Sequence, residues 1–235
     1  MTHALQQTLD LSITSTKTFD NFTCPTNSDA KKMLEYYIKN PSESMIIIEG
    51  NQGTGKTHLL LAACHFFQQS GRRASFIPLR NPADIEMFFS QPIAGDLICI
   101  DDVHLATKHS DLEHNLFRLY NHAELSGSKL IWSKSSQCQF QRKDLQSREQ
   151  SMLSIQLLPY TPNETYQILM QHLEQSQSTI SGDICQLLIK DYTRNISKLL
   201  CKLKEIEAYA HSTQKKVTMK MARELIQADI HPLTA

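Results

Sequence analysis

The stretch Gly50-Asn51-Gln52-Gly53-Thr54-Gly55-Lys56-Thr57 decides the fold, because it fits the pattern G-x-x-x-x-G-K-[ST] at every fixed position. The apolar, β-branched run 45–48 precedes it and the apolar segment 58–67 follows it, so the stretch joins an expected buried strand to an expected helix. Glycines let backbone N–H groups converge on anionic oxygens, and the helix N-terminus adds partial positive charge. The sequence therefore predicts a phosphate-binding loop in which Lys56 reaches the β- and γ-phosphates of a nucleotide and Thr57 holds Mg²⁺.

A second strand that ends in acids supports a nucleotide site. The run 97–100 is apolar and is followed by Asp101 and Asp102. A phosphate-loop ATPase needs a carboxylate at the tip of a neighbouring strand to organise magnesium, and Asp101 fits that position. Asp102 is the candidate for orienting or polarising the attacking water. The alternative is a strand that merely ends in polar turn residues.

Composition excludes several classes of protein. Lysine plus arginine equal aspartate plus glutamate, which argues against a strongly basic nucleic-acid-binding domain. The six cysteines are scattered, without C-x-x-C spacing and without histidines at zinc-ligand spacing, as expected for reduced cytosolic thiols. No apolar run approaches the roughly 20 residues that span a bilayer, and no secretory signal opens the chain. We therefore expect a cytoplasmic protein without a membrane partner.

The pattern along the chain predicts two folded domains. Expected strands lie at 45–48, 74–79, 96–102, 129–133 and 154–158. An expected helix at 29–39 precedes the first strand, and further expected helices lie between the strands at 58–70, 82–89 and 111–126. Strands that alternate with helices imply a parallel sheet covered on both faces. After the sheet we expect only helices, at about 162–176, 181–192, 195–211 and 218–228. The predicted division is a flexible polar tail at 1–16, an α/β nucleotide-binding domain at 17–160 and a helical domain at 161–235.

Several segments together resemble a known group of proteins. Thr18-Phe19-Asp20-Asn21-Phe22, the helix start at 58–64, the acidic strand at 97–102 and the segment 117–121 are similar in order and spacing to the DnaA initiator family of AAA+ ATPases. The resemblance covers about residues 17–228 and extends to the short, Hda-type regulators of that family. It implies a five-stranded parallel sheet with a C-terminal helical lid. It also implies ADP or ATP with Mg²⁺ as the ligand.

The resemblance assigns roles to further residues. Arg148, in Asp144-Leu145-Gln146-Ser147-Arg148, resembles the family's arginine finger, which reaches into the nucleotide site of a neighbouring subunit, and a surface arginine in a polar loop is the alternative. Arg194 resembles the lid arginine that senses the phosphates, and a helix-capping or exposed arginine is the alternative. The resulting catalytic candidates are Arg148 and Asp102, and the metal ligands are Thr57 and Asp101. The expected nucleotide contacts are Gly50, Gln52, Gly53, Thr54, Gly55, Lys56, Thr57, His58, Phe22 and Arg194.

Two features depart from the family pattern, and one is that Glu149-Gln150-Ser151 follows Arg148 in place of the family's aromatic-glycine pattern. The family usually has an acidic residue just after the fourth strand, and this chain has Lys134 near that position. A cation there should change how the site reads the γ-phosphate. Fast hydrolysis by this chain is therefore not what the sequence favours.

The resemblance implies a regulatory role. Short members of the family bind the DNA-loaded sliding clamp and promote hydrolysis of DnaA-bound ATP, so the expected partners are DnaA, the clamp, DNA through the clamp, and another copy of the chain. Gln7, Leu9 and Leu11 loosely match the clamp-binding peptide, although the stretch also fits a plain polar tail. Two alternatives stay open: a self-acting ATPase of the helicase-loader or protein-remodelling type, and a nucleotide-gated DNA tether.

Overall fold

The computed structural model describes residues 17–40, 45–80, 95–135, 137 and 139–230, and these form two compact units. The sheet unit contains the described parts of 17–22, 28–51 and 55–157. The helical unit contains 23–27, 52–54 and the described part of 158–235. The expected helix at 82–89 and the tail with Gln7, Leu9 and Leu11 lie outside the described residues.

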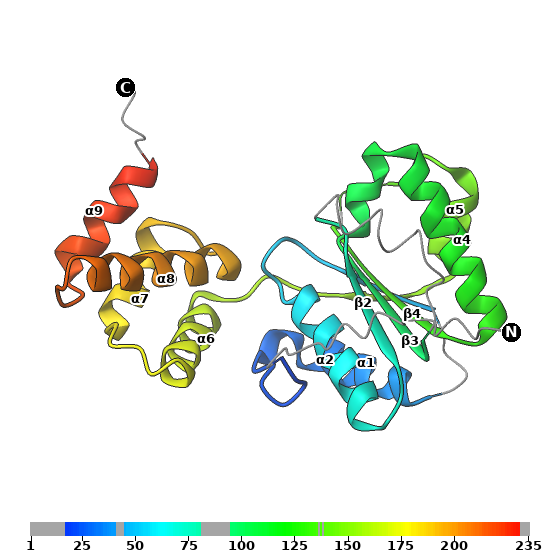
Figure 1. Cartoon of the computed structure of the whole chain (residues 1–235), viewed down its shortest axis with the longest axis horizontal. Helices are drawn as coiled ribbons and strands as arrows, with labels where there is room; N and C mark the ends of the chain where they lie inside the picture. Colours follow the sequence, from blue (N-terminus) through cyan, green and yellow to red (C-terminus); the bar gives the residue numbers. More distant parts are fainter. Residues whose placement is uncertain (1–16, 41–44, 81–94, 136, 138, 231–235) are drawn as a thin grey trace, which may run out of the picture. The chain divides into compact units, whose positions relative to one another are not determined.

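A parallel five-stranded sheet forms the centre of the sheet unit (Figure 1). Its strands are β1 (Met45–Glu49), β2 (Ala74–Pro78), β3 (Leu97–Asp101), β4 (Lys129–Lys134) and β5 (Leu153–Gln156). Their order is β2-β3-β4-β1-β5, and every neighbouring pair is parallel. The carboxyl ends of all five strands therefore share one edge, where ligands bind in open α/β sheets. The predicted parallel five-stranded sheet is confirmed.

Helices cover both faces of this sheet. They are α1 (Ser28–Lys39), α2 (Lys56–Gln69), α4 (Ser110–Ser126) and α5 (Lys143–Ser151), together with the 3₁₀ segment η2 (Val103–Lys108). Figure 1 shows α1 and α2 on one side of the sheet and α4 and α5 on the other. The helix α5 was not expected, because its nine residues bury only Leu145 and show no apolar periodicity.

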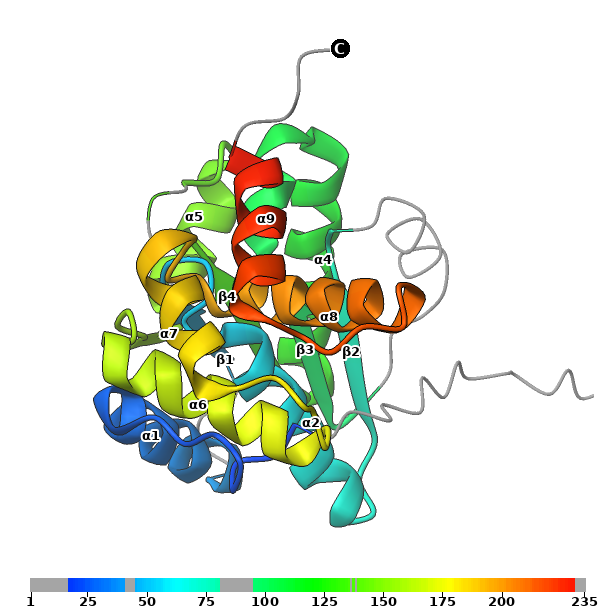
Figure 2. The ribbon, with the colours of Figure 1, turned by 90° about the vertical axis from the view of Figure 1, so that its left-hand side faces the viewer.

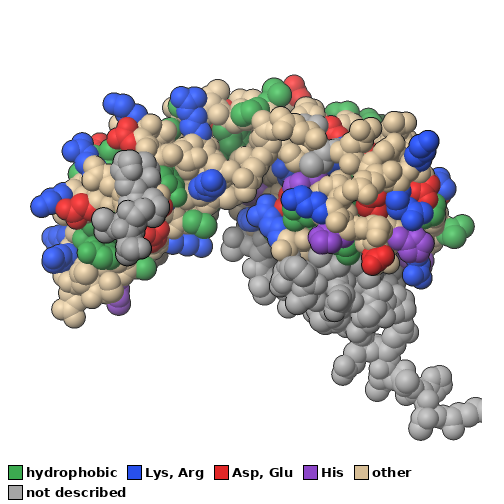
Figure 3. All heavy atoms as spheres, turned by 90° about the horizontal axis from the view of Figure 1, so that it is seen from above, with side chains coloured by type: hydrophobic (Ala, Val, Ile, Leu, Met, Phe, Trp, Pro, Cys, Tyr) green, Lys and Arg blue, Asp and Glu red, His purple; other side chains and the backbone are tan. Residues whose placement is uncertain are grey.

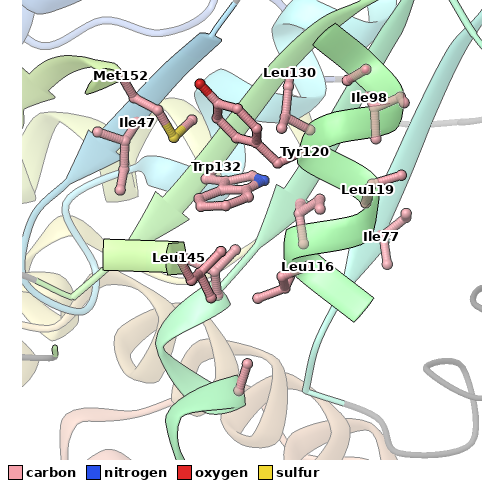
Figure 4. Close-up of a cluster of buried hydrophobic side chains, with 14 of the residues drawn as sticks. Ile47, Ile77, Ile98, Leu116, Leu119, Tyr120, Leu130, Trp132, Leu145 and Met152 are labelled. Atoms are coloured by element: carbon pink, nitrogen blue, oxygen red, sulfur yellow. The ribbon is translucent and has the colours of Figure 1, made fainter. Parts of the chain in front are cut away.

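The apolar face of α4 packs on alternate residues of β3 and β4. Leu116 and Tyr120 of α4 share one buried cluster with Ile98 of β3 and Trp132 of β4, and Leu145 of α5 joins it (Figure 4). Trp132 is completely buried, and its ring meets the Tyr120 ring edge-on with 6.1 Å between centroids. Alternation along the strands sends the intervening side chains to the α2 face of the sheet.

The helical unit is built from four helices. These are α6 (Pro162–Gln175), α7 (Gly182–Asp191), α8 (Ile196–Ser212) and α9 (Met219–Ile230) (Figure 2). Their apolar faces share a second buried cluster centred on Leu169, Leu188 and Leu203. All four lie within a few residues of the predicted ranges.

A short segment from before the sheet belongs to this helical unit. Glu164 forms a capping box with Thr161 at the start of α6, and its carboxylate also accepts hydrogen bonds from the backbone N–H and the hydroxyl of Thr26. Asn27, in the 3₁₀ turn η1 (Pro25–Asn27), exchanges two hydrogen bonds with the backbone of Leu158. A division at residue 161 therefore leaves out residues 23–27 and 52–54, which the contacts group with the helices.

Charged side chains are mixed on the surface. On the face seen in Figure 3, lysines and arginines lie among aspartates and glutamates over the described residues of both units. This mixture agrees with the balanced charge of the sequence. None of the described helices combines the length and the apolar composition needed to cross a membrane.

Candidate functional site

The predicted phosphate loop connects β1 to α2 at the carboxyl edge of the sheet. Gly53 and Gly55 have φ angles of 86° and 97°, which side-chain-bearing residues rarely adopt. Lys56, the first residue of α2, is buried, and its Nζ donates to the carbonyls of Gly50 at 2.8 Å and Asn51 at 3.0 Å. Burial lowers the pKa of Lys56, while the nearby aspartates oppose this effect. The ammonium is thus held inside the loop, where phosphate oxygens can replace the carbonyls.

The two predicted magnesium ligands meet at this loop. The hydroxyl of Thr57 donates to Oδ2 of Asp101 at 2.7 Å, and Ser133 of β4 donates to the other carboxylate oxygen. Burial, followed by the charge of Asp102, raises the pKa of Asp101, and the two hydroxyl donors lower it. One hydroxyl and one carboxylate suit Mg²⁺, which prefers oxygen ligands and keeps several waters and phosphate oxygens around it. Within the described residues no cluster of three His, Cys, Asp or Glu offers a fuller metal site.

Asp102 is held from several directions. It has a φ angle of 60°, a left-handed conformation that costs a residue other than glycine about 1 kcal/mol or more. Its N–H donates to Ser133 Oγ at 2.8 Å, and its carboxylate pairs with Nε of Arg80, just after β2. His104 Nδ1 lies 3.9 Å from the other carboxylate oxygen and accepts the N–H of Ser135. The acid is therefore buried, oriented and neutralised by a cation.

The sequence did not single out Arg80, Ser133 or His104. Each is one polar residue just beyond a strand or at its end, in a pattern that many turns share. The order of the strands, which places β3 between β2 and β4, brings Arg80 and Ser133 to the two aspartates, and His104 follows them in η2.

His58 and Phe22, both expected near the nucleotide, contact each other. The rings meet edge-on with 5.2 Å between centroids. His58 Nε2 lies 2.9 Å from the carbonyl of Thr18 and 3.0 Å from Oδ1 of Asn21, and because both are acceptors this nitrogen carries the proton. Burial lowers the pKa of His58 to about 4. The imidazole therefore attaches segment 18–22 to the first turn of α2.

The tip of the phosphate loop, residues 52–54, groups with the helical unit. The hydroxyl of Tyr160 donates to the carbonyl of Thr54 at 2.8 Å. A Cβ added at Gly53 would come within 3.2 Å of the Asn195 side chain. Arg194 precedes Asn195 and is exposed, and it makes no hydrogen bond or ion pair with the part of the chain that the structure describes. The predicted lid arginine thus neighbours a residue that approaches the loop, and its role stays a prediction.

Arg148 lies in the last turn of α5. Its guanidinium is 3.5 Å from Glu124 of α4 and 5.2 Å from the centre of the Tyr120 ring, with 39% of the side chain exposed. Ser151 Oγ donates to the carbonyl of Arg148 and contacts the hydroxyl of Tyr120. Among the described residues, Arg148 makes no hydrogen bond or ion pair with the phosphate loop of its own chain.

Lys134 is the last residue of β4. It is buried, and its ammonium pairs with Glu149 of α5 and lies 3.6 Å from Glu49 of β1. The N–H of Gly50 donates to the carbonyl of Lys134 at 3.2 Å. Lys134, which stands where the family usually has an acidic residue, is therefore a cation paired with carboxylates beside the loop.

Comparison with known proteins identifies the fold that carries this site. No protein-family model matches the sequence. The structure is similar to domain III of the replication initiation protein DnaA from Thermotoga maritima, with a TM-score of 0.74 and 24% identity over 92% of this chain and 98% of that domain. The chain has the AAA+ ATPase fold. A second AAA+ neighbour is AMPPCP-bound DnaA from Aquifex aeolicus, with a TM-score of 0.65 and 20% identity over 81% of this chain and 65% of that one.

The AAA+ fold by itself does not specify one activity. The Thermotoga maritima RuvB Holliday junction branch migration motor is also similar, with a TM-score of 0.61 and 15% identity over 90% of this chain and 72% of that one. The present chain spans 64% of a DNA replication initiation factor and 65% of the Aquifex DnaA chain. Function must therefore be argued from the site.

Proposed function

We propose that this protein is an Hda-type regulator of chromosome replication initiation. It binds adenine nucleotide and the DNA-loaded sliding clamp, and it promotes hydrolysis of the ATP bound to DnaA. DNA is reached through the clamp, and a second copy of the chain is a further candidate partner. The similarity to DnaA domain III supports a role related to replication initiation. The positions of Arg148 and Lys134 support a role in hydrolysis at a partner's site.

The position of Arg148 is the observation that carries the proposal. The guanidinium of Arg148 is partly exposed, and among the described residues it makes no hydrogen bond or ion pair with its own phosphate loop. It is therefore available to the nucleotide of another subunit. Its planar fork suits charge that spreads over γ-phosphate oxygens, and a finger of this kind acts in trans in GTPase activation. Tyr120 and Glu124 hold the side chain in place, which reduces the entropy lost when it docks.

The protein's own loop serves binding in this proposal. Lys56 and the N-terminus of α2 hold the phosphates of ADP or ATP, and Thr57 with Asp101 holds Mg²⁺. Lys134 is occupied by two carboxylates, which supports slow hydrolysis at this site. The bound nucleotide then sets the shape of the protein that engages DnaA.

The direct test measures DnaA–ATP turnover with clamp-loaded DNA, with and without this protein. We expect acceleration by the parent protein and its loss in Arg148→Ala. Arg73→Ala is the matched control, since Arg73 is an exposed arginine just before β2, at the opposite edge of the sheet. No acceleration by the parent, or an Arg148→Ala protein as active as the parent, would overturn the proposal.

The clamp is tested separately. A pull-down on sliding clamp compares the full chain with a chain lacking residues 1–12 and with a Gln7→Ala, Leu9→Ala, Leu11→Ala variant. Equal retention of all three proteins would remove the clamp peptide from the proposal while leaving the role of Arg148 in place.

A second function is favoured by one observation. Asp102 is oriented by Ser133 and Arg80 beside a complete phosphate loop, as a self-acting ATPase of the helicase-loader or remodelling type requires. Substantial ATP turnover by the protein alone, abolished by Asp102→Asn, would favour this alternative.

A further inference from the structure

We propose that Lys134 is a positioning residue that couples occupancy of this protein's own phosphate loop to the setting of Arg148. This inference rests on the proposed function, because it concerns how the position of Arg148, the proposed arginine finger, is controlled. Its structural elements are the end of β4, the loop that follows β1, and the helix α5.

On the loop side, Lys134 is attached at two points. Its carbonyl accepts the N–H of Gly50, the first residue of the phosphate loop, at 3.2 Å. Its ammonium lies 3.6 Å from the carboxylate of Glu49, which stands opposite it in the register of β1 and β4. The two contacts are made with Glu49, the last residue of β1, and Gly50, the first residue of the loop. A loop that becomes more ordered therefore holds Lys134 more firmly.

On the finger side, the same ammonium pairs with Glu149, the residue next to Arg148. Consecutive helical residues point in different directions, so Glu149 faces Lys134 while Arg148 faces Tyr120 and Glu124. The helix α5 has nine residues and buries only Leu145, so few contacts fix its position. The Lys134–Glu149 pair is one of these contacts, and it connects α5 to the end of β4 beside the loop.

Burial makes this connection strong. The exposed fractions of the side chains are 9% for Lys134, 13% for Glu149 and 24% for Glu49, so water screens the three charges weakly. One ammonium serves two carboxylates, and neither carboxylate has another ion pair among the described residues. Because the loop becomes more ordered when its N–H groups and Lys56 hold phosphates, Lys134 and Glu149 are held more firmly as well. Nucleotide binding should then stabilise α5 and fix Arg148.

Hydrogen exchange of α5 tests the inference without any DnaA. The amides of residues 143–151 are followed in the full chain with and without ADP and Mg²⁺. We expect ADP to slow exchange in α5 of the parent protein by at least about threefold. Glu149→Gln should bind ADP within about twofold of the parent affinity and lose the slowing in α5, because an amide does not replace the ion pair. Glu35→Gln is the matched control, since Glu35 pairs with Lys31 on α1 at 4.0 Å.

Variants at Lys134 complete the design. Lys134→Arg keeps a cation and should keep the response of α5 to ADP, whereas Lys134→Met should lose it. If Lys134→Met does not fold, the Glu149→Gln result decides. The inference is overturned if ADP leaves α5 exchange unchanged in the parent, or if Glu149→Gln keeps the full response.

The two proposals fail in different ways. A parent protein that accelerates DnaA–ATP hydrolysis but shows no response of α5 to ADP would overturn the coupling alone. A parent protein in which α5 responds to ADP but DnaA–ATP hydrolysis is not accelerated would support the coupling and overturn the proposed function.

Discussion

The hydroxyl of Thr57 donates to the carboxylate of Asp101 across 2.7 Å, so the first turn of α2 and the end of β3 are joined at the predicted magnesium position. Asp101→Asn keeps the shape of this contact and removes the charge. We expect affinity for Mg²⁺–ADP to fall by about tenfold or more, because magnesium sites depend strongly on their few anionic ligands.

The measurement is a titration with a fluorescent ADP analogue, with Mg²⁺ and with EDTA. The affinity in EDTA should hardly change, because Lys56 and the loop N–H groups are untouched. Asp96→Asn, at the opposite end of β3, is the control. A loss of equal size with and without Mg²⁺ would show that Asp101 supports the fold of the loop and does not hold the metal.

Arg80 should set the pH at which the metal site works. Burial and Asp102 raise the pKa of Asp101, and the charge of Arg80 lowers it. Arg80→Ala therefore raises the pKa of Asp101 further, and a protonated carboxyl does not hold Mg²⁺. The midpoint of Mg²⁺-dependent ADP binding should move to higher pH in Arg80→Ala. It should stay in place in Arg73→Ala, and an unmoved or lowered midpoint in Arg80→Ala would contradict the expected charge effect.

His58 makes folding stability depend on pH. Its folded pKa of about 4 lies below the ordinary value of 6.5, because burial disfavours the charged form. As pH falls, the unfolded chain takes up the proton first. The contribution of His58 to the free energy of unfolding is therefore fully present above pH 6.5 and is lost as pH falls toward 4. The slope is at most about 1.4 kcal/mol per pH unit.

The check for His58 is urea denaturation of the parent and of His58→Asn across this range. His104 and His172 also have lowered pKa values, so only the difference between the two proteins counts. The free energy of unfolding should fall less steeply in the variant. Parallel pH profiles would mean that His58 is solvated in the folded protein.

Much of this fold could be predicted, because its strands and helices carry strong local signals. The apolar run before Gly50, the acids at the end of β3 and the periodic helices from residue 162 onward each specify their element without reference to distant contacts. The helix α5 carries no such signal, since only Leu145 is buried and the rest is polar. Its existence depends on tertiary packing against α4 and β4, which sequence patterns do not encode.

The same distinction separates the predicted and missed parts of the site. Lys56, Thr57 and Asp101 follow a spacing that phosphate and magnesium chemistry requires. Arg80 and Glu149 belong to no sequence motif, because the side chains that they pair with lie at the ends of other strands. Residues 23–27 join the helical unit through Glu164, a contact that spans well over half of the chain. Interactions of this kind depend on strand order and on contacts between distant segments of one unit, which become known only from the structure.

Lys134 of β4 and Arg148 of α5 should differ sharply in their effect on stability. Lys134→Met leaves Glu49 and Glu149 close together and mostly buried without their cation, and we expect a cost of about 3 kcal/mol in the free energy of unfolding. Arg148→Met removes a partly exposed pair with Glu124, and the expected cost is below about 1 kcal/mol. Trp132, the only tryptophan, is buried beside Tyr120 and reports unfolding by fluorescence. The double variant Lys134→Met, Glu149→Gln should recover part of the loss, because one of the two unpaired charges is then gone. If Lys134→Met costs no more than Arg148→Met, the ammonium does not bridge these carboxylates in solution.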